Sequence, residues 1–571
     1  MSLPVDTVNV CNWAMNKRSI EFVEDLSNDI LRSPVYKTIV NIVGDENILK
    51  YYKVFMVDKI SSKLMFFSLA KDLTVNYDDL LIIPDDTDNS FLQKKLFGRC
   101  DGLDRYIPRS AYFCNKVRKY WEKILAIVLF VFLPLGYVIL RLNKLRLQKK
   151  DLVKYDVAMP VVYGFYEDNG IVNGVLTPHK DTYLYCQRIR PGQIIHIFNY
   201  WRTTSDIEND FKRVMEKNGM HYIDINSYVF SPRLMLMAAK IQLKILAGFI
   251  TNFCYLRDKS DYLSCAAAII YHMVNIHLEL ENIDYKVEFS CFDYSPIHII
   301  KTIICNKLGK KTVGIQHAAS PYDLPHLSFV HFDRYIVYAD DFIRQFSPYW
   351  NKLRLEKAGR ETVDFVLEVL GDAERLVRLK EKMRRIYPVR KYTVVFALCS
   401  DVEWISDERW QELYSALGAL KGLDIDFNLF LRFRESDAGY MNNFKRISEQ
   451  DPRIIIDQVN FTNYELMVLS DLFIACNMSF AINEALASRA KVFTFDLHGR
   501  TKYVFGDYGN DFIIYKRDDF LRVFRGLENN FEGLDCKWEL LRDHCNFYYD
   551  GKNLGRIQKA VCDTLSQIKG N

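Results

Sequence analysis

The stretch Asp471–Asp496, DLFIACNMSFAINEALASRAKVFTFD, sets the fold expected for this chain. Asp471–Cys476 is a short apolar run, and Asn477–Ser479 interrupts it with small polar residues. Phe480–Ala487 carries helix formers with apolar residues on one face, and Lys491–Phe495 is a second β-rich run. This order predicts a parallel strand–helix–strand unit. The turn after its first strand then lies at the carboxyl edge of a sheet, where ligands bind in open α/β folds.

Two side chains of this unit are candidates for ligand contacts. Ser479 comes just before the predicted helix, whose free N–H groups and dipole favour a phosphate. Glu484 lies one to two turns inside the helix, where it can reach a sugar hydroxyl. The alternative is an ordinary βαβ unit, in which Ser479 is a helix cap and Glu484 faces solvent.

The same unit resembles a known family. The pattern Asp-Leu-Phe-Ile-Ala, then Ser479, then Glu484-Ala-Leu-Ala and Lys-Val-Phe, is similar to the donor-binding segment of GT-B glycosyltransferases. Those enzymes have two domains and use nucleotide sugars. The resemblance implies an α/β fold of the GT-B type, with two Rossmann-like domains facing a cleft. It also implies that Ser479 and Glu484 hold the donor phosphate and the sugar or ribose.

Length and composition limit the class of protein. A chain of 571 residues is too long for one core, so two domains with an appendage are expected. Its net charge of +4 is small for this size and does not suggest a nucleic-acid partner. The 13 cysteines are scattered without a CxxC pair, which argues against structural zinc and a disulfide scaffold and favours a reducing cytoplasm.

The first 115 residues are expected to form a small α/β region, or the start of the first Rossmann-like domain. Ser19–Leu31 is a predicted helix in this region. Its β-like runs are Val5–Val10, Thr38–Val43, Val54–Val57 and Leu80–Ile83.

Ile124–Leu140 is an apolar outlier without a charged residue, and its 17 residues fall short of the ~20 that span a bilayer. Pro134 and Gly136 are expected to break it beyond its middle. Because Lys/Arg-rich flanks resist translocation, both ends are expected on the cytoplasmic face of the inner (plasma) membrane. We predict a bent, re-entrant or interfacial anchor on anionic headgroups. A buried core helix and a single span are the alternatives. The basic flanks are Lys116, Arg118, Lys119 and Lys123 before it, and Arg141, Lys144, Arg146, Lys149 and Lys150 after it.

Two polar residues follow consecutive predicted strands in the next region. Asp293 comes after Val287–Phe292, and His317 comes after Lys311–Ile315. Both therefore lie at the carboxyl ends of parallel strands, where a shared cleft is expected. A carboxylate and an imidazole at such a place suit acid–base or phosphate-contacting work. The alternative is that each residue is structural.

A second resemblance starts from this strand end. Lys-Thr-Val-Gly-Ile-Gln-His317-Ala is similar to the Gly-x-Gln-His-Gly strand end of bacterial surface-polysaccharide GT-B enzymes, with Ala318 where Gly is commoner. These include capsule and O-antigen assembly transferases, with more distant echoes in polysialyl and teichoic-acid-type enzymes. Such families often place an acidic residue at the end of the preceding strand, and Asp293 holds that position. The resemblance covers roughly residues 155–515.

Further candidates lie on other strand ends. Glu167 and Asp168 follow a predicted strand in a Gly/Asn-rich loop and are possible acceptor-side bases; the alternative is an exposed turn. Arg432 and Arg434 end the predicted strand Phe427–Phe433 and, if it persists, share one face. A guanidinium suits a diphosphate because it donates two parallel hydrogen bonds. A surface pair with Glu435 is the alternative.

The predicted division of the chain follows from these segments. Its parts are an N-terminal α/β region (1–115), a membrane-associating segment (116–150), a GT-B N-terminal acceptor domain (151–345), a linker helix (346–390), a GT-B C-terminal donor domain (391–515) and C-terminal helices (516–571). In GT-B enzymes a C-terminal helix often crosses back to the first domain.

The predicted function is a metal-independent transfer of sugar from a nucleotide-sugar donor to a glycan or polyprenyl-linked acceptor of a bacterial surface polysaccharide. Asp293 is the predicted general base, and His317 contacts the donor or transition state. Ser479, Glu484 and an arginine bind the donor and offset charge on the leaving phosphate, so neither metal nor cofactor is expected. One alternative is a CMP-sugar or CDP-polyol transferase on this fold. The other is a non-catalytic, membrane-attached GT-B scaffold of a polysaccharide-assembly complex. Nucleic acid is not an expected partner.

Overall fold

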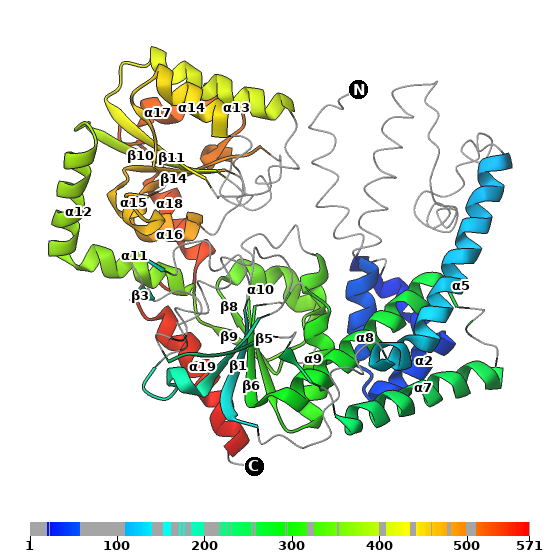
Figure 1. Cartoon of the computed structure of the whole chain (residues 1–571). Helices are drawn as coiled ribbons and strands as arrows, with labels where there is room; N and C mark the ends of the chain where they lie inside the picture. The colour runs from blue at the N-terminus through cyan, green and yellow to red at the C-terminus, as the bar shows by residue number, and fades with distance from the viewer. Residues whose placement is uncertain are drawn as a thin grey trace.

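The computed structural model describes residues 20–57, 109–139 and 152–569, with gaps inside these ranges. The gaps are 22, 162–170, 173–174, 177–183, 185, 199–215, 217–218, 225–226, 230, 253–254, 256–257, 292, 294, 317–324, 351–352, 399–406, 434–440, 458, 477–480 and 498–509. Of the predicted site residues, Glu167, Asp168, His317, Arg434 and Ser479 lie outside the described part. Figure 1 shows two α/β domains, with a group of helices beside the first.

The first domain is built on a seven-stranded sheet in the order β5-β4-β1-β6-β7-β8-β9. Every neighbouring pair in it is parallel. Parallel sheets need cover on both faces, which is why these strands are almost continuously apolar. The strands are β1 (Lys154–Val161), β4 (Ile194–Phe198), β5 (His221–Asp224), β6 (Asp284–Ser290), β7 (Lys311–Ile315), β8 (Arg334–Val337) and β9 (Leu355–Lys357). A separate antiparallel pair is formed by β2 (Ile171–Val172) and β3 (Val175–Leu176).

Helices cover both faces of this sheet. Val157 and Met159 of β1 belong to the core cluster shared with α19 (Asn553–Lys569), whereas Ala158 between them belongs to the cluster on the other face. That second cluster contains α8 (Ser260–Asn282) and α9 (Ile297–Lys307). The alternation follows from the two-residue period of a strand.

The second domain contains a six-stranded parallel sheet in the order β12-β11-β10-β13-β14-β15. Its strands are β10 (Tyr392–Ala397), β11 (Phe427–Arg432), β12 (Ile454–Ile456), β13 (Leu472–Cys476), β14 (Lys491–Phe495) and β15 (Ile513–Ile514). Its helices are α13 (Asp407–Ala419), α14 (Met441–Gln450), α15 (Asn463–Leu469), α16 (Ala481–Ala487), α17 (Arg517–Gly526) and α18 (Asp535–Cys545). The predicted unit is confirmed: β13 and β14 pair in parallel with α16 between them. Two parallel-sheet α/β domains confirm the predicted fold class.

Several elements join the domains. The chain leaves the first sheet through α10 (Asp340–Phe346) and β9, then continues into α11 (Glu361–Gly371) and α12 (Ala373–Ile386). β9 pairs with β8, so the first sheet extends into the segment that was expected to be a linker. α11 packs on α15 and α16 of the second domain and also on α19.

The C-terminal helix returns to the first domain, as the resemblance implies. α19 contacts β6, β7 and β8. The buried guanidinium of Arg334 on β8 donates a hydrogen bond of 3.0 Å to the carbonyl of Ala560 on α19. Residues far apart in the chain therefore close the first domain.

The described part of the N-terminal region is helical, and the strands predicted at Thr38–Val43 and Val54–Val57 are wrong. The first lies in α2 (Pro34–Val43) and the second in a helical stretch at 48–57. Ser33 caps α2 by accepting from the Tyr36 N–H, and Gly44 ends it in the left-handed conformation. This helix buries positions three or four apart, which outweighs the β preference of its branched residues. The predicted runs Val5–Val10 and Leu80–Ile83 lie outside the described residues.

The apolar segment belongs to one long helix, α5 (Arg109–Ile139), which packs on α7 (Pro232–Asn252) and α8. The break expected at Pro134 and Gly136 is wrong, because α5 continues through both. A proline removes one backbone hydrogen bond, and here the proline lies on the packed face of the helix. Among the described residues, α8 has the length and apolarity to cross a membrane, but 61% of its apolar stretch is buried inside the protein.

Candidate active site

The carboxyl end of β6 leads to the predicted general base. Asp293 lies three residues past β6 and is buried. The hydroxyl of Tyr335 on β8 donates a hydrogen bond of 2.6 Å to its Oδ2. Burial, and then the charge of Asp293, raise the pKa of Tyr335 well above its ordinary value of 10. The phenol therefore keeps its proton and orients the carboxylate.

Gln316 ties the carboxyl ends of β7 and β8 together. Its backbone N–H donates to the carbonyl of Ile336 at 2.9 Å, and its side-chain Oε1 accepts from the N–H of Tyr338 at 2.9 Å. Gln316 is buried, so these bonds satisfy a polar group that would otherwise be costly. The glutamine of the Gln-His pair therefore joins the carboxyl end of β7 to the carboxyl end of β8. The sequence signal was a polar residue closing an apolar strand.

Both sheets meet at the amino end of α11. The hydroxyl of Tyr338, just past β8, donates to Glu361 Oε2 at 3.1 Å. The neighbouring Arg360 forms an ion pair with Glu484 of α16, with 3.1 Å between Nη2 and Oε1. Thr362 Oγ1 donates to the same Glu484 oxygen at 2.6 Å. The predicted donor ligand Glu484 is therefore buried at the domain junction and held by α11.

The C-terminal segment also contacts this junction and holds Arg360 in place. The N–H of Arg360 donates to Asn546 Oδ1 at 2.7 Å, and its carbonyl accepts from Asn553 Nδ2 at 3.1 Å. Gly359 has φ 72°, and a Cβ there would lie 2.4 Å from Asn553 Oδ1. Only glycine fits both the left-handed backbone and the close contact. The chain therefore enters α11 along a path that two asparagines define.

The domain junction contains more buried carboxylates than buried guanidinium groups among these charged residues. Arg360 lies with Glu361, Glu484 and Asp364, and all four are buried. Asp364 Oδ2 accepts from the N–H of Leu554 at 2.7 Å. Burial raises the pKa of Asp364 from 3.8 to about 6, although this hydrogen bond opposes the shift. The amino end of α11 thus combines an ion pair with a carboxyl group that titrates in mildly acidic solution.

Arg432 ends β11, as the sequence predicts, and is buried there. Its Nε donates to Asn463 Oδ1 at 2.8 Å, and its Nη1 donates to the carbonyl of Asp457. These contacts anchor the loop between β12 and α15 to the carboxyl end of β11. β11 ends at Arg432, so it does not extend far enough to place Arg432 and Arg434 on one strand face. Arg434 itself lies outside the described residues.

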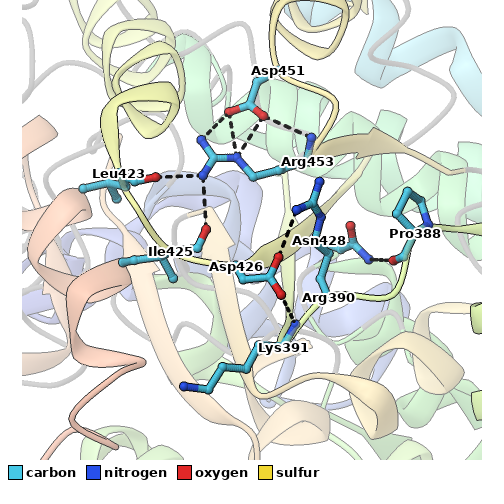
Figure 2. A network of polar contacts seen from close by, with 9 residues as sticks. All are labelled: Pro388, Arg390, Lys391, Leu423, Ile425, Asp426, Asn428, Asp451 and Arg453. Carbon is cyan, nitrogen blue, oxygen red and sulfur yellow. Dashed lines mark hydrogen bonds and ion pairs between the residues drawn. The ribbon is translucent and has the colours of Figure 1, made fainter.

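A different charged network lies at the amino edge of the same sheet (Figure 2). Arg453, just before β12, bonds both carboxylate oxygens of Asp451 and the carbonyl of Leu423 at 2.8 Å. Asp426, just before β11, accepts from Arg390 Nη1 at 2.9 Å and from the N–H of Lys391 at 2.8 Å. These groups close the loops that start the strands and lie at the edge opposite to Arg432.

Buried charges also occur inside the first domain, away from the strand ends. Lys301 Nζ lies 3.0 Å from a Glu279 oxygen and 2.7 Å from a Glu288 oxygen. The hydroxyl oxygen of Tyr285 lies 3.0 Å from an oxygen of each carboxylate. Burial raises the pKa of Glu288 above its ordinary value, while Lys301 opposes the shift. This cluster joins α8, β6 and α9 and is structural.

The part of the chain that the structure describes contains no group of three or more His, Cys, Asp or Glu side chains that could hold a metal ion. Asp293 is bonded to Tyr335, whose side chain packs on one face of the first sheet, whereas Tyr338, which bonds to Glu361, packs on the other face. The sequence pointed to Asp293 and Glu484 but not to their partners, which are Tyr335 for the first and Arg360 and Thr362 for the second.

Comparison with known proteins gives fold-level likeness only. The sequence matches no protein-family model and no curated protein. The UDP-GlcNAc 2-epimerase from Neisseria meningitidis has 11% identity and a TM-score of 0.43, over 72% of this chain and 100% of that chain. The MnaA–UDP structure from S. aureus has 9% identity and a TM-score of 0.41, over 71% and 95%. The wall teichoic acid polymerase TagF has 12% identity and a TM-score of 0.38, over 80% and 98%.

Proposed function

We propose that this chain is a metal-independent glycosyltransferase that moves a sugar from a nucleotide-sugar donor to a glycan or polyprenyl-linked acceptor of a bacterial surface polysaccharide. The observation that carries the proposal is the meeting of two parallel sheets at the amino end of α11. β8 reaches this point through Tyr338 and Glu361, and the β13–α16 unit reaches it through Glu484 and Arg360. Ligands of open α/β sheets bind beyond the carboxyl ends of the strands. A molecule at the junction would touch both domains.

The second domain supplies the donor contacts in this proposal. Ser479 and an arginine, Arg432 or Arg434, bind the phosphates, and Glu484 receives a hydroxyl of the sugar or ribose. Among the described residues, Arg360 and Thr362 both contact Glu484 at Oε1. A carboxylate has a second oxygen that accepts hydrogen bonds, so a donor hydroxyl can bind Oε2 while Arg360 stays in place. Arg360 then orients the group that reads the donor.

The first domain supplies the acceptor contacts. Asp293 is the proposed general base, and Tyr335 orients it. His317 contacts the donor or the transition state, and Glu167 and Asp168 are further candidates for the acceptor side. A guanidinium at the end of β11 would offset the charge that develops on the leaving phosphate, which is the work a metal ion does in other enzymes.

Two alternatives use the same fold. The Gln-His strand end favours a donor such as a CMP-sugar or CDP-polyol, with the same residues in the same roles. The burial of both Asp293 and Glu484 against protein partners favours a second candidate, a non-catalytic, membrane-attached scaffold of a polysaccharide-assembly complex. A scaffold would keep the junction and bind no donor.

A thermal-shift panel of UDP, CDP and CMP tests the proposal. A ligand that binds only the native state stabilises it by about 2.7 kcal/mol at 100 times its Kd. We expect at least one nucleotide to raise the melting temperature of the wild-type chain, and Glu484→Gln to weaken that response. Glu374→Gln is the matched control, because the Glu374 side chain on α12 is 88% exposed. No response to any nucleotide at millimolar concentration would favour the scaffold.

A further inference from the structure

α5 leaves a broad apolar face in solvent. Trp121, Leu125 and Phe132 are 66%, 57% and 59% exposed, and they follow one another at helical spacing. The opposite face of α5 is packed, since Phe130 and Val131 are buried. The exposed face is therefore a consistent stripe on a helix whose other side belongs to the core.

α7 carries a second stripe of the same kind. Leu236, Leu243 and Ile250 are 58%, 65% and 68% exposed. They are seven residues apart, so they lie above one another on one side of the helix. Leu234 and Ile245 on another side of α7 are buried in the core of the first domain.

The two helices are parts of one body. Gln242 of α7 donates a hydrogen bond to the carbonyl of Val131 in α5. The ring of Phe130 in α5 packs edge-on against Tyr255, just after α7, with 5.4 Å between centroids. Large exposed apolar patches mark contact surfaces, and each of these two adjoining helices carries an exposed apolar stripe.

The charged residues in the sequences of the two helices are mostly basic. The sequence of α7 contains Arg233, Lys240 and Lys244 and no Asp or Glu. Residues 116–123 of α5 contain four basic residues and one acid, Glu122. An apolar stripe beside basic side chains is complementary to a bilayer with anionic headgroups, whereas a protein partner would also call for hydrogen-bonding groups of both kinds.

We propose that α5 and α7 together form the face by which this protein lies on an anionic membrane surface, on the cytoplasmic side of the plasma membrane. Both helices lie along the bilayer and insert their apolar stripes into the headgroup region, with Trp121 at the interface, as is common for tryptophan. α8 stays in the core beneath them. This surface goes beyond the proposed transferase activity and stands whatever the chain transfers.

Vesicle co-sedimentation of the full-length chain tests this surface. The vesicles contain either phosphatidylcholine alone or phosphatidylcholine with about one third phosphatidylglycerol, at low and high salt. The α7 variant is Leu236→Ser/Leu243→Ser/Ile250→Ser, the α5 variant is Trp121→Ser/Leu125→Ser/Phe132→Ser, and the charge variant is Lys240→Gln. The matched control is Val389→Ser/Val459→Ser, since these valines of the second domain are 73% and 89% exposed. A melting curve of each variant confirms that it is folded.

We expect the wild type to bind the anionic vesicles, with weaker binding at high salt. Each triple variant should bind at least about tenfold more weakly, and Lys240→Gln about fivefold more weakly. The control should bind like the wild type. If a folded α7 variant binds the vesicles as well as the wild type does, the role of α7 is overturned. If the control and the triple variants all bind equally and more weakly than the wild type, the proposed surface itself is overturned. A stripe variant that changes the oligomeric state but not vesicle binding would point to a second copy of the chain instead and would also overturn it.

Discussion

At the amino edge of the second sheet, the side chains of Arg390 and Asp426 form an ion pair in which they are 32% and 49% exposed. At the domain junction, the side chains of Arg360 and Glu484 form an ion pair in which they are 7% and 8% exposed. The two pairs have the same chemistry, but only the second is shielded from water. Its electrostatic consequences are therefore larger.

Distance along the chain separates the two regions as well. Arg453 and Asp451 of the amino-edge network are two residues apart, whereas Thr362 and Glu484 of the junction are 122 apart. The amino edge closes local loops and stabilises one domain. The junction holds two domains and the returning C-terminal segment in one arrangement, so events there can be felt by both sheets.

The largest effect is expected for Arg360→Met. This change leaves Glu484 buried without its cationic partner, and breaking such a pair costs about 3–5 kcal/mol. Chemical denaturation followed by intrinsic fluorescence should show this loss in the free energy of unfolding. Combining Arg360→Met with Glu484→Leu should restore most of it, because no charge is then stranded. A loss below 1 kcal/mol in the single variant would contradict a shielded pair.

Acid should affect the two regions in opposite directions. The folded pKa of Asp364 is raised to about 6, so its contribution to stability is fully present below about pH 3.8 and is lost as the pH rises through about 6. Relative to Asp364→Asn, the wild type should therefore lose up to about 3 kcal/mol between pH 4 and pH 7. The asparagine still accepts from the Leu554 N–H. Glu288 also has a raised pKa, but it is present in both the wild type and Asp364→Asn. Its contribution therefore cancels when the two pH profiles are subtracted.

The pKa of Asp426 is shifted in the opposite direction, so the pH dependence of its contribution to stability is also opposite. Its hydrogen bond from Arg390 lowers its pKa below 3.8, so the stability it contributes is present above that pH and is lost on further acidification. Asp426→Asn should leave the profile between pH 4 and pH 7 unchanged. A profile for Asp364→Asn that superimposes on the wild type would contradict the buried environment of Asp364.

A smaller effect is expected for Arg453→Met at the amino edge. This change removes hydrogen bonds to the carbonyls of Leu420 and Leu423 and to Asp451, at a cost of about 1–3 kcal/mol. The loss should be confined to the second domain, so hydrogen exchange in β11 and β12 should quicken while α9 and β7 are unaffected. Equal destabilisation of both domains would show that the network is not local.

The smallest effect is expected for Arg390→Ala. Exposed ion pairs contribute about 0–1 kcal/mol, because water and salt screen them. The free energy of unfolding should decrease by an amount within that range. At high salt, the variant and the wild type should have the same free energy of unfolding. A loss as large as that of Arg360→Met would remove the contrast between the two regions.

The sequence predicted the sheets well because their strands are buried on both faces. β7 and β14 match their predicted bounds, since short apolar runs between turn residues leave few alternatives. β9 was missed because its residues, Leu-Glu-Lys, carry no apolar pattern. The predicted strand at Thr38–Val43 was wrong because Ser33, Pro34 and Gly44 specify a helix whose packing overrides β preference.

The candidate site was only partly predictable. Asp293 and Glu484 are found beside strand ends because alternation of strands and helices fixes which residues follow a strand. Arg360 and Thr362 meet Glu484 only after the chain has folded, and no local pattern marks a contact that spans more than a hundred residues. Burial of the carboxylates likewise depends on how the domains close over them.

Hydrogen exchange with and without a saturating nucleotide, UDP, CDP or CMP, tests the central claim most directly. If the junction of the two sheets binds the donor, exchange should slow in residues 359–364 and 481–487 and stay unchanged in residues 423–428 and 451–456 at the amino edge. Bound nucleotide that protects the amino edge and leaves the junction unchanged would contradict the account.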